Sequence, residues 1–354
     1  MPLLAYLAPL LFPVLVLLSF FSEGWWTLAP VVCVWGLLPA MEAAIGPVRD
    51  NLETDQLRAR AHQRGFSYVL YLHAALHFVV LGAFLWRLDS GAGGTLEWAG
   101  WILAMGISCG TVAINIAHEL GHKRRRFDQR LAKLLLTSSF WPQFFFDHNR
   151  GHHVHVGTRE DATTARLGES LFAFLPRAMW GETVGAWRLS SEGLRRRGKP
   201  LLHPNNEILR WWGLGALGLA VVAVALGPEI AGAWFLAGMI GVVLLEAVDY
   251  IEHYGLTRER LPSGDLEPVD TTHSWNSDFL LGRLLLVELV RHSDHHANAA
   301  RPFQSLRSVD GAPQHPLGYP GMMVLAACPP LWFRVMHPRI ENLRANKGLA
   351  AAVA

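Results

Sequence analysis

Long apolar stretches separated by polar segments fill the chain up to residue 117 and return between residues 208 and 250. The first stretch carries no charge and has no basic residues ahead of it, so it is interpreted as a span and not as a signal peptide. A helix crosses a bilayer with about 20 mostly apolar residues, and the tripeptide GPE divides the last stretch into two antiparallel spans. The pattern predicts an all-α integral membrane protein, one membrane-embedded domain over residues 1–354, with about six transmembrane helices at residues 2–21, 25–45, 66–86, 96–117, 208–226 and 230–250.

A further apolar stretch, LAKLLLTSSFWPQFFF at residues 131–146, follows the fourth predicted span. It is short for a transmembrane helix, and Pro142 interrupts it. Irregular backbone at membrane depth is tolerated where it is buried within protein. We therefore predict an interfacial or re-entrant helix for this segment.

Basic residues mark one side of the predicted bundle. The short connections at residues 22–24 and 227–229 contain no Lys or Arg, whereas several arginines lie between the second and third spans and the runs HKRRR and RRRGK follow the fourth. Cytoplasmic loops of membrane proteins carry an excess of Lys and Arg. Both termini and the two large polar regions, 118–207 and 251–354, are therefore expected in the cytoplasm.

Composition supports the membrane assignment and narrows the chemistry. Charged residues make up 17% of the chain, against about 25% in soluble proteins. The cysteines form no C-x-x-C pair, which excludes a disulfide framework, a zinc ribbon and an iron–sulfur or rubredoxin module within the chain. The formal net charge of +2 gives no reason to expect a nucleic-acid partner.

The first chemical motif is HELGHK at residues 118–123. His-Glu-x-x-His is the zinc-peptidase motif, in which two histidines on one helix face bind the metal and the glutamate acts as general base. His118 and His122 have this spacing, but Glu119 points away from the face that they share. A peptidase is one hypothesis, and it requires one further zinc ligand.

Three more clusters supply far more histidine than one zinc ion uses. They are DHNRGHHVHV at 147–156, DYIEHYGL at 249–256 and RHSDHHAN at 291–298. Together with HELGHK they would fill four or five positions on each of two metal ions, all on one predicted side of the membrane. The candidate ligands are His118, His122, His148, His152, His153, His253, His292, His295 and His296. His73 and His77 repeat the i, i+4 spacing inside the third predicted span, and we interpret them as contacts between helices.

The identity of the metal follows from the chemistry that the surroundings favour. Imidazole binds zinc, iron, copper and nickel, so the ligands alone do not select the ion. A binuclear centre at a bilayer surface, supplied with apolar substrate, suggests oxygen chemistry, and zinc has no redox activity. We predict two iron ions, with O2 as co-substrate.

The histidine motifs resemble those of the integral-membrane alkane 1-monooxygenases, which are related to xylene monooxygenase and to the membrane fatty-acyl desaturases. The family patterns H-E-x-x-H-K and H-S-D-H-H stand unchanged at 118–123 and 292–296. The pattern E-H-x-x-G-H-H appears with Asp147 in place of Glu, and N-Y-x-E-H-Y-G appears with Asp249 in place of Asn. The flanking sequences EDATTARLGES, HSWNSDF and RPFQSLR...LGYPGM are also similar.

This resemblance implies a non-haem di-iron monooxygenase of the bacterial inner membrane, with the nine histidines as ligands and the active site facing the cytoplasm. It implies hydroxylation of the terminal methyl group of a medium-chain n-alkane to a primary alcohol. Electrons would come from rubredoxin, or a ferredoxin, with an NAD(P)H-dependent reductase, because the chain has no flavin, haem or iron–sulfur motif of its own. The arginine runs at 124–126 and 195–197 are candidates for docking an acidic donor.

Acidic residues accompany the candidate ligands. Metal-bound histidines usually donate their other ring N–H to a carboxylate or a carbonyl. We expect this role for some of Asp147, Asp249, Glu252 and Asp294, each within four positions of a ligand. Trp35, deep in the second predicted span, is a candidate for the wall of a substrate channel.

Alternative functions stay open on the sequence alone. A xylene-type aryl-methyl monooxygenase or a desaturase-like oxidase would use the same ligands. A membrane zinc metallopeptidase would need His118, His122 and one more ligand, and a non-catalytic metal-binding or transport protein would consume no electrons.

Overall fold

The computed structural model describes residues 1–91 and 93–353, and the side chains of these residues as far as residue 345. Within this part, the chain is helical without β-strands, and six stretches are long and apolar enough to cross a membrane. They are Leu3–Phe20, Gly24–Ile45, Gly65–Asp89, Thr95–Gly121, Glu207–Ala225 and Pro228–His253. The six predicted spans are confirmed. The fourth and sixth run further than predicted, so their ends lie at the histidines.

Several spans contain more than one type of helix. The first consists of the 3-10 helix η1 (Leu3–Leu10) and α1 (Leu11–Phe20), and the third is α5 (Gly65–Asp89). The second consists of η2 (Gly24–Leu28), α2 (Ala29–Val32), the π-helical turn η3 (Cys33–Leu37) and α3 (Leu38–Ile45). The fourth consists of α6 (Thr95–Ser108), the π-helical turn η4 (Cys109–Ile114) and α7 (Asn115–Gly121). The last two are α12 (Glu207–Ala225) and α13 (Pro228–His253).

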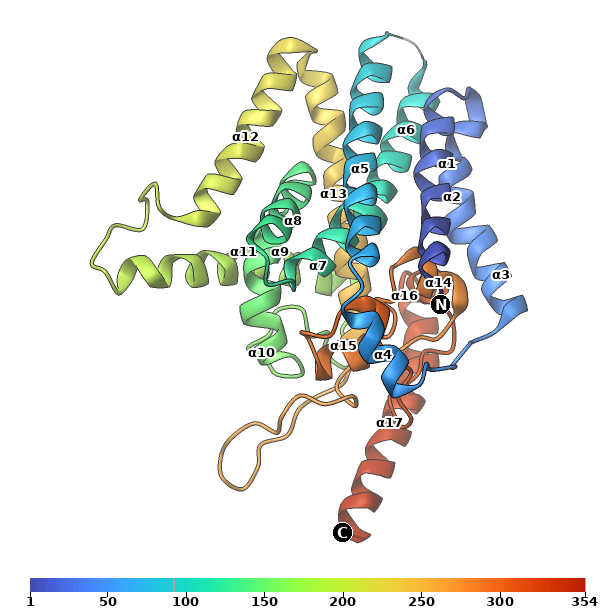
Figure 1. Ribbon diagram of the computed structural model, residues 1–354, viewed down its shortest axis with the longest axis vertical. Helices are drawn as coiled ribbons and strands as arrows, with labels where there is room; N and C mark the ends of the chain where they lie inside the picture. The colour runs from blue at the N-terminus through green and yellow to red at the C-terminus, as the bar shows by residue number, and fades with distance from the viewer. Residues whose placement is uncertain (92, 354) are drawn as a thin grey trace.

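The remaining helices lie outside the six spans, and most of them form a cap at one end of the bundle (Figure 1). They are α4 (Thr54–Ala61), α8 (Arg126–Ser138), α9 (Gln143–Asp147), η5 (His148–His152), α10 (His153–His155), α11 (Leu171–Arg195), α14 (Leu280–Leu285), α15 (His292–Ala297), η6 (Phe303–Ser305), α16 (Tyr319–Ala326) and α17 (Pro329–Val353). Figure 1 shows α9, α10 and α14–α16 at the lower end of the bundle, with the N-terminus at the same end and α12 leaning away from the other spans.

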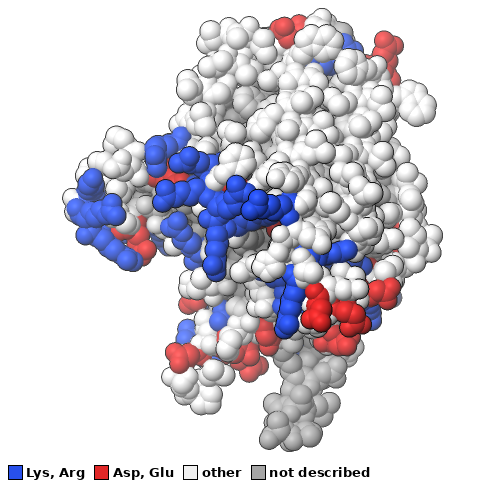
Figure 2. All heavy atoms as spheres, viewed as in Figure 1, with Lys and Arg blue, Asp and Glu red and all other residues white. Residues whose placement is uncertain are grey.

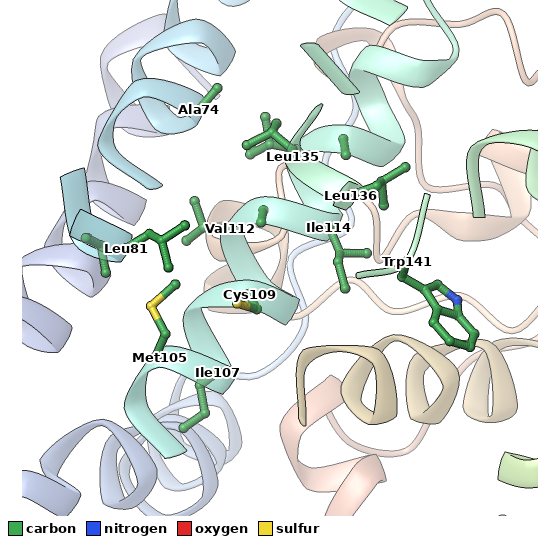
Figure 3. Close-up of a cluster of buried hydrophobic side chains, with 14 of the residues drawn as sticks. Ala74, Leu81, Met105, Ile107, Cys109, Val112, Ile114, Leu135, Leu136 and Trp141 are labelled. Carbon is green, nitrogen blue, oxygen red and sulfur yellow. The ribbon is translucent and has the colours of Figure 1, made fainter. Parts of the chain in front are cut away.

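The fourth span lies at the centre of the bundle. α6 packs against α1 and α13, and η4 packs against α5, α8 and α13. Figure 3 shows Met105 and Val112 of this span beside Leu81 of α5, with Leu135 of α8 in the same cluster.

Small residues let the fourth and sixth spans approach closely. A Cβ atom on Gly106 would lie 2.6 Å from Ile240 Cβ, and one on Gly241 would lie 2.6 Å from Cys109 Cβ. Close backbone approach through small residues is typical of helix pairs in membranes, where burial of apolar surface between helices gives little net driving force. This contact holds together the two spans that carry His118 and His253 near their ends.

The apolar stretch at residues 131–146 reverses direction inside the bundle. α8 ends at Ser138, and Phe140 follows in a left-handed conformation with φ 59°. The Trp234 indole of α13 donates a hydrogen bond to the Ser138 carbonyl at 3.0 Å, and the chain then returns as α9. The reversal delivers the next residues, from His148 onward, to the cap.

Candidate metal centre and its cavity

Nine histidines converge where the fourth and sixth spans meet the cap. Five elements supply them: the end of α7, the turn η5, α10, the end of α13, and α15. One group comprises His118, His122, His148, His153 and His295, and the other comprises His152, His253, His292 and His296. Within each group, one nitrogen of every ring lies within 4.8 Å of those of the other rings. The structure thus brings all nine predicted ligands together in two sets.

The ring nitrogens have the spacing of ligands that share an ion. In the first group, His118 Nε2 lies 3.2 Å from His295 Nε2 and 3.3 Å from His122 Nε2. In the second, His152 Nε2 lies 3.2 Å from His296 Nε2. Imidazole ligands bind at about 2.0–2.1 Å, so two of them at roughly a right angle are about 3 Å apart. The donor set therefore fits two metal ions, one in each group.

A π-helical turn divides three neighbouring histidines between the two groups. His148 and His153 are five residues apart, and η5 between them follows the i→i+5 hydrogen-bond pattern of a π-helix. Their Nε2 atoms lie 3.1 Å apart in the first group, whereas His152 faces the second. Such turns often occur at functional sites, and η4 likewise leads directly into the helix of His118.

Burial prepares most of these rings for metal binding. Burial, followed by the proximity of His152, lowers the pKa of His122 to about 4. Burial is also the largest cause that lowers the pKa of His148, His153 and His295 well below the ordinary value. A neutral imidazole is the form that binds a metal. At neutral pH these rings therefore do not have to release a proton before they bind one.

His152 differs from its neighbours because Asp161 contacts it. Burial alone would lower the pKa of His152, but the Asp161 carboxylate, 2.9 Å from Nδ1, raises it. The same contact outweighs burial at Asp161 and holds its pKa at about 2. A hydrogen bond from Nδ1 to this carboxylate fixes the ring and leaves Nε2 free for a metal.

Two of the four predicted acidic residues lie beside the second group. Glu252 Oε1 is 3.2 Å from His292 Nδ1 and also accepts a hydrogen bond from the Tyr319 hydroxyl at 2.6 Å. Asp249 and Glu252 form a third close set with His253, again within 4.8 Å. Their positions suit the predicted role of orienting ligands.

The other two acids have different surroundings. Asp147 packs against α11, where a Cβ atom on Gly185 would lie 2.0 Å from its Oδ1 atom, and burial followed by Asp161 raises its pKa to about 7. Asp294 instead pairs with Arg301 and accepts the Arg307 backbone N–H at 2.9 Å. Asp294 therefore anchors the loop after α15 through these two arginines.

An apolar cavity extends from the histidines into the spans. His118, His148 and His292 line one part of it. The rest is lined mainly by residues of the first, second, third, fourth and sixth spans, of the segment 282–289 and of α16. Trp35, proposed for a channel wall, is among them. The lining residues that stay partly exposed include Trp35, Leu38, Leu244, Val248 and Met323, which belong to the second and sixth spans and to α16.

Sequence reasoning did not single out Asp161 or Tyr319. Both lie in flanking segments that resemble the family, EDATTARLGES and LGYPGM, but nothing in their spacing indicates a contact with His152 or Glu252.

Glu119, the general base of the peptidase hypothesis, accepts the Phe303 backbone N–H at 3.5 Å. His77 bonds to Ser138 Oγ at 2.9 Å, as expected for a contact between helices.

Comparison with known proteins agrees with this geometry. The chain matches the fatty acid desaturase family over residues 96–326. Alkane 1-monooxygenase 2 of Pseudomonas aeruginosa is 41% identical over 328 residues, 91% of this chain and 86% of that protein. Alkane 1-monooxygenase of Ectopseudomonas oleovorans is 36% identical over 314 residues, 88% of this chain and 78% of that protein. The hydroxylase component XylM of the Pseudomonas putida xylene/toluene monooxygenase is 27% identical over 277 residues, 77% of this chain and 73% of that protein.

The six spans, the histidine groups and the desaturase match define the class: a multi-pass membrane oxidoreductase with a histidine-rich metal site. Within that class, the chain belongs to the alkane 1-monooxygenase family, as its motifs predicted. It is therefore an oxygen-dependent enzyme that requires an electron donor. Family membership rules out the zinc-peptidase and non-catalytic hypotheses.

Proposed function

We propose that this enzyme hydroxylates the terminal methyl group of a medium-chain n-alkane to give a primary alcohol. The balanced reaction is RCH3 + O2 + 2e⁻ + 2H⁺ → RCH2OH + H2O. One observation carries the proposal: two histidine groups adjoin an apolar cavity that is lined by membrane-spanning helices. The names of the relatives supply the substrate class.

The side chains of the cavity have defined tasks in this reaction. Apolar residues such as Phe12, Ile107 and Leu286 bind the hydrocarbon and exclude water. The partly exposed residues at Leu38 and Val248 mark a route from the bilayer, so the substrate need not cross water. Two bound irons would supply the activation of O2 and the abstraction of hydrogen. The nine histidines hold those ions, and Asp161 and Glu252 orient the rings of His152 and His292.

Electron supply is assigned to rubredoxin, or a ferredoxin, with its NAD(P)H-dependent reductase. Figure 2 shows Lys and Arg side chains gathered on the left of the molecule, at the height of α11, while the surface above is nearly free of them. An acidic donor would associate faster with such a surface through complementary charge. The exposed Lys and Arg residues of segments 124–130 and 188–210 are named here the basic surface: Arg124, Arg125, Arg126, Arg130, Arg188, Arg195, Arg196, Arg197, Lys199 and Arg210.

The same charge distribution supports the orientation. Apart from Arg210, the basic surface lies in the polar region that follows the fourth span, and the histidine groups lie at the ends of the fourth and sixth spans and in the polar regions that follow them. Membrane proteins carry an excess of Lys and Arg on their cytoplasmic side. This favours an enzyme of the bacterial inner membrane whose active site faces the cytoplasm. A cytoplasmic donor would then reach the centre directly.

Product analysis tests the proposed substrate. Detergent-purified enzyme, supplied with rubredoxin, its reductase and NAD(P)H, should convert n-octane to 1-octanol faster than p-xylene to the benzylic alcohol. The match to XylM makes an aryl-methyl substrate the second candidate. Faster turnover of p-xylene, with no alcohol formed from n-alkanes, would overturn the proposal in favour of that candidate.

A further inference from the structure

The turn after α14 has an unusual backbone. Val287 and Glu288 both adopt left-handed conformations, with φ 53° and φ 60°. A left-handed residue commonly follows a helix, but glycine usually occupies that position because a Cβ atom is disfavoured there. A β-branched residue such as valine is a genuine outlier. The chain therefore tolerates a local conformation that a glycine would adopt without strain.

Buried polar contacts hold this turn in place. The Glu288 backbone N–H donates to the Arg283 carbonyl at 2.7 Å, and the Glu288 carboxylate accepts from Arg283 Nε at 2.8 Å. The Tyr6 hydroxyl of the first span donates to the same carboxylate at 2.7 Å. All three side chains are buried. A strained backbone conformation persists when many surrounding contacts hold it in place. Such conformations are found mostly at functional sites.

The strained residue lies on the wall of the apolar cavity. Val287 is 4% exposed, and it lines the cavity together with Leu286, Leu289 and His292 of the second histidine group. Val287 precedes His292 by five positions in the sequence. A glycine at position 287 would satisfy the turn but would remove a side chain from the wall of the cavity.

We propose that Val287 is a specificity-determining residue, whose side chain sets how an alkane lies against the histidine centre and so favours attack on the terminal carbon. The inference rests on the proposed function and adds the residue that governs which carbon reacts. Trimming this side chain should let the alkane shift along the cavity, so that the penultimate carbon also reaches the centre.

Product ratios from n-octane test the inference. Val287→Gly and Val287→Ala should each raise the ratio of 2-octanol to 1-octanol by about ten-fold or more, the scale expected when methyl groups are removed from an apolar pocket. Val290→Ala is the matched control, because Val290 is the same residue type in the same segment, fully buried, and is not part of the cavity wall. Its ratio should equal that of the wild type.

The possible failures are distinguishable. A wild-type enzyme that forms 1-octanol, with unchanged ratios in both Val287 variants or with an equal shift in Val290→Ala, overturns the role of Val287 alone. A wild-type enzyme that forms no alcohol from any alkane overturns the proposed function on which the inference rests. Val287→Ala keeps a side chain at the turn, so the test stands if the glycine variant fails to fold.

Discussion

Asp161 lies outside every histidine motif, yet its carboxylate contacts His152 Nδ1 at 2.9 Å and also accepts hydrogen bonds from Thr163 and Thr164. A carboxylate in this position fixes the orientation of a ligand ring and increases its basicity. The threonine contacts fix the carboxylate in turn. One acidic side chain therefore connects the second histidine group to the loop after α10.

Replacing this carboxylate should weaken the metal centre. Asp161→Asn should lower the metal affinity of the second group by about 10–100-fold. The asparagine amide oxygen carries no full negative charge and is therefore a weaker acceptor for the His152 N–H. Retention of metal against a competing chelator measures the effect. Asp310→Asn, at an exposed aspartate, is the control and should match the wild type. Equal retention in the two variants would show that Asp161 does not support the centre.

Single residues also show where sequence reasoning stopped. The nine histidines were predictable because their motifs are local in sequence. Asp161 and Tyr319 were not, because each reaches its partner only through the tertiary fold. The division of the histidines between two groups was equally out of reach, since positions 148, 152 and 153 do not reveal that the helix between them is a π-helical turn.

At the scale of one element, α11 approaches the centre closely enough to require glycine. Gly185 faces Asp147, and a Cβ atom there would lie 2.0 Å from Oδ1. Gly193, on the same helix, has nothing within 4 Å of its Cβ position. A Gly→Ala change at either position alters the helix propensity by the same amount. The two positions differ only in how closely other atoms pack against them.

Alanine at these two positions should have opposite effects. Gly185→Ala should destabilise the protein by about 1–3 kcal/mol, as overpacking of a filled interior does. Gly193→Ala should be neutral or stabilising by about 0.5–1 kcal/mol, because alanine is the better helix former. Thermal unfolding of the two variants in the same detergent measures the difference. A Gly185→Ala protein as stable as Gly193→Ala would contradict the close packing of α11 against Asp147.

The helices themselves were largely predictable, since long apolar runs determine where a chain crosses a bilayer. Their ends were less so: α13 continues to His253 because the histidine motif stays helical beyond the apolar run. The segment 131–146 was correctly predicted not to be a full span, but its reversal at Phe140 depends on contacts with α13 that the sequence does not show.

At the scale of the whole molecule, charge and apolar surface are segregated. Lys and Arg side chains gather on the left of the molecule, and the surface above them is nearly free of charge (Figure 2). If an acidic donor docks there, its association depends on long-range attraction that salt screens. The charge runs at 124–126 and 195–197 suggested such a surface, and both runs are exposed in the structure.

Charge reversal tests this docking surface. The triple variant Arg195→Glu, Arg196→Glu and Arg197→Glu should raise the KM for rubredoxin by roughly ten-fold or more at low salt and should leave kcat at saturating donor unchanged. Arg339→Glu, an exposed arginine on α17, is the control and should leave both constants as in the wild type. A triple variant with wild-type KM and wild-type salt dependence would place the donor elsewhere.

The central claim is that the two histidine groups hold two irons, and metal analysis of detergent-purified protein tests it most directly. The wild type, expressed with ample iron, should contain about two irons per chain. His295→Ala and His296→Ala, one from each group, should each lose roughly one iron, whereas His155→Ala, a neighbouring histidine outside both groups, should retain both. About one zinc and no iron in the wild type would contradict the account, as would full iron content in both group variants.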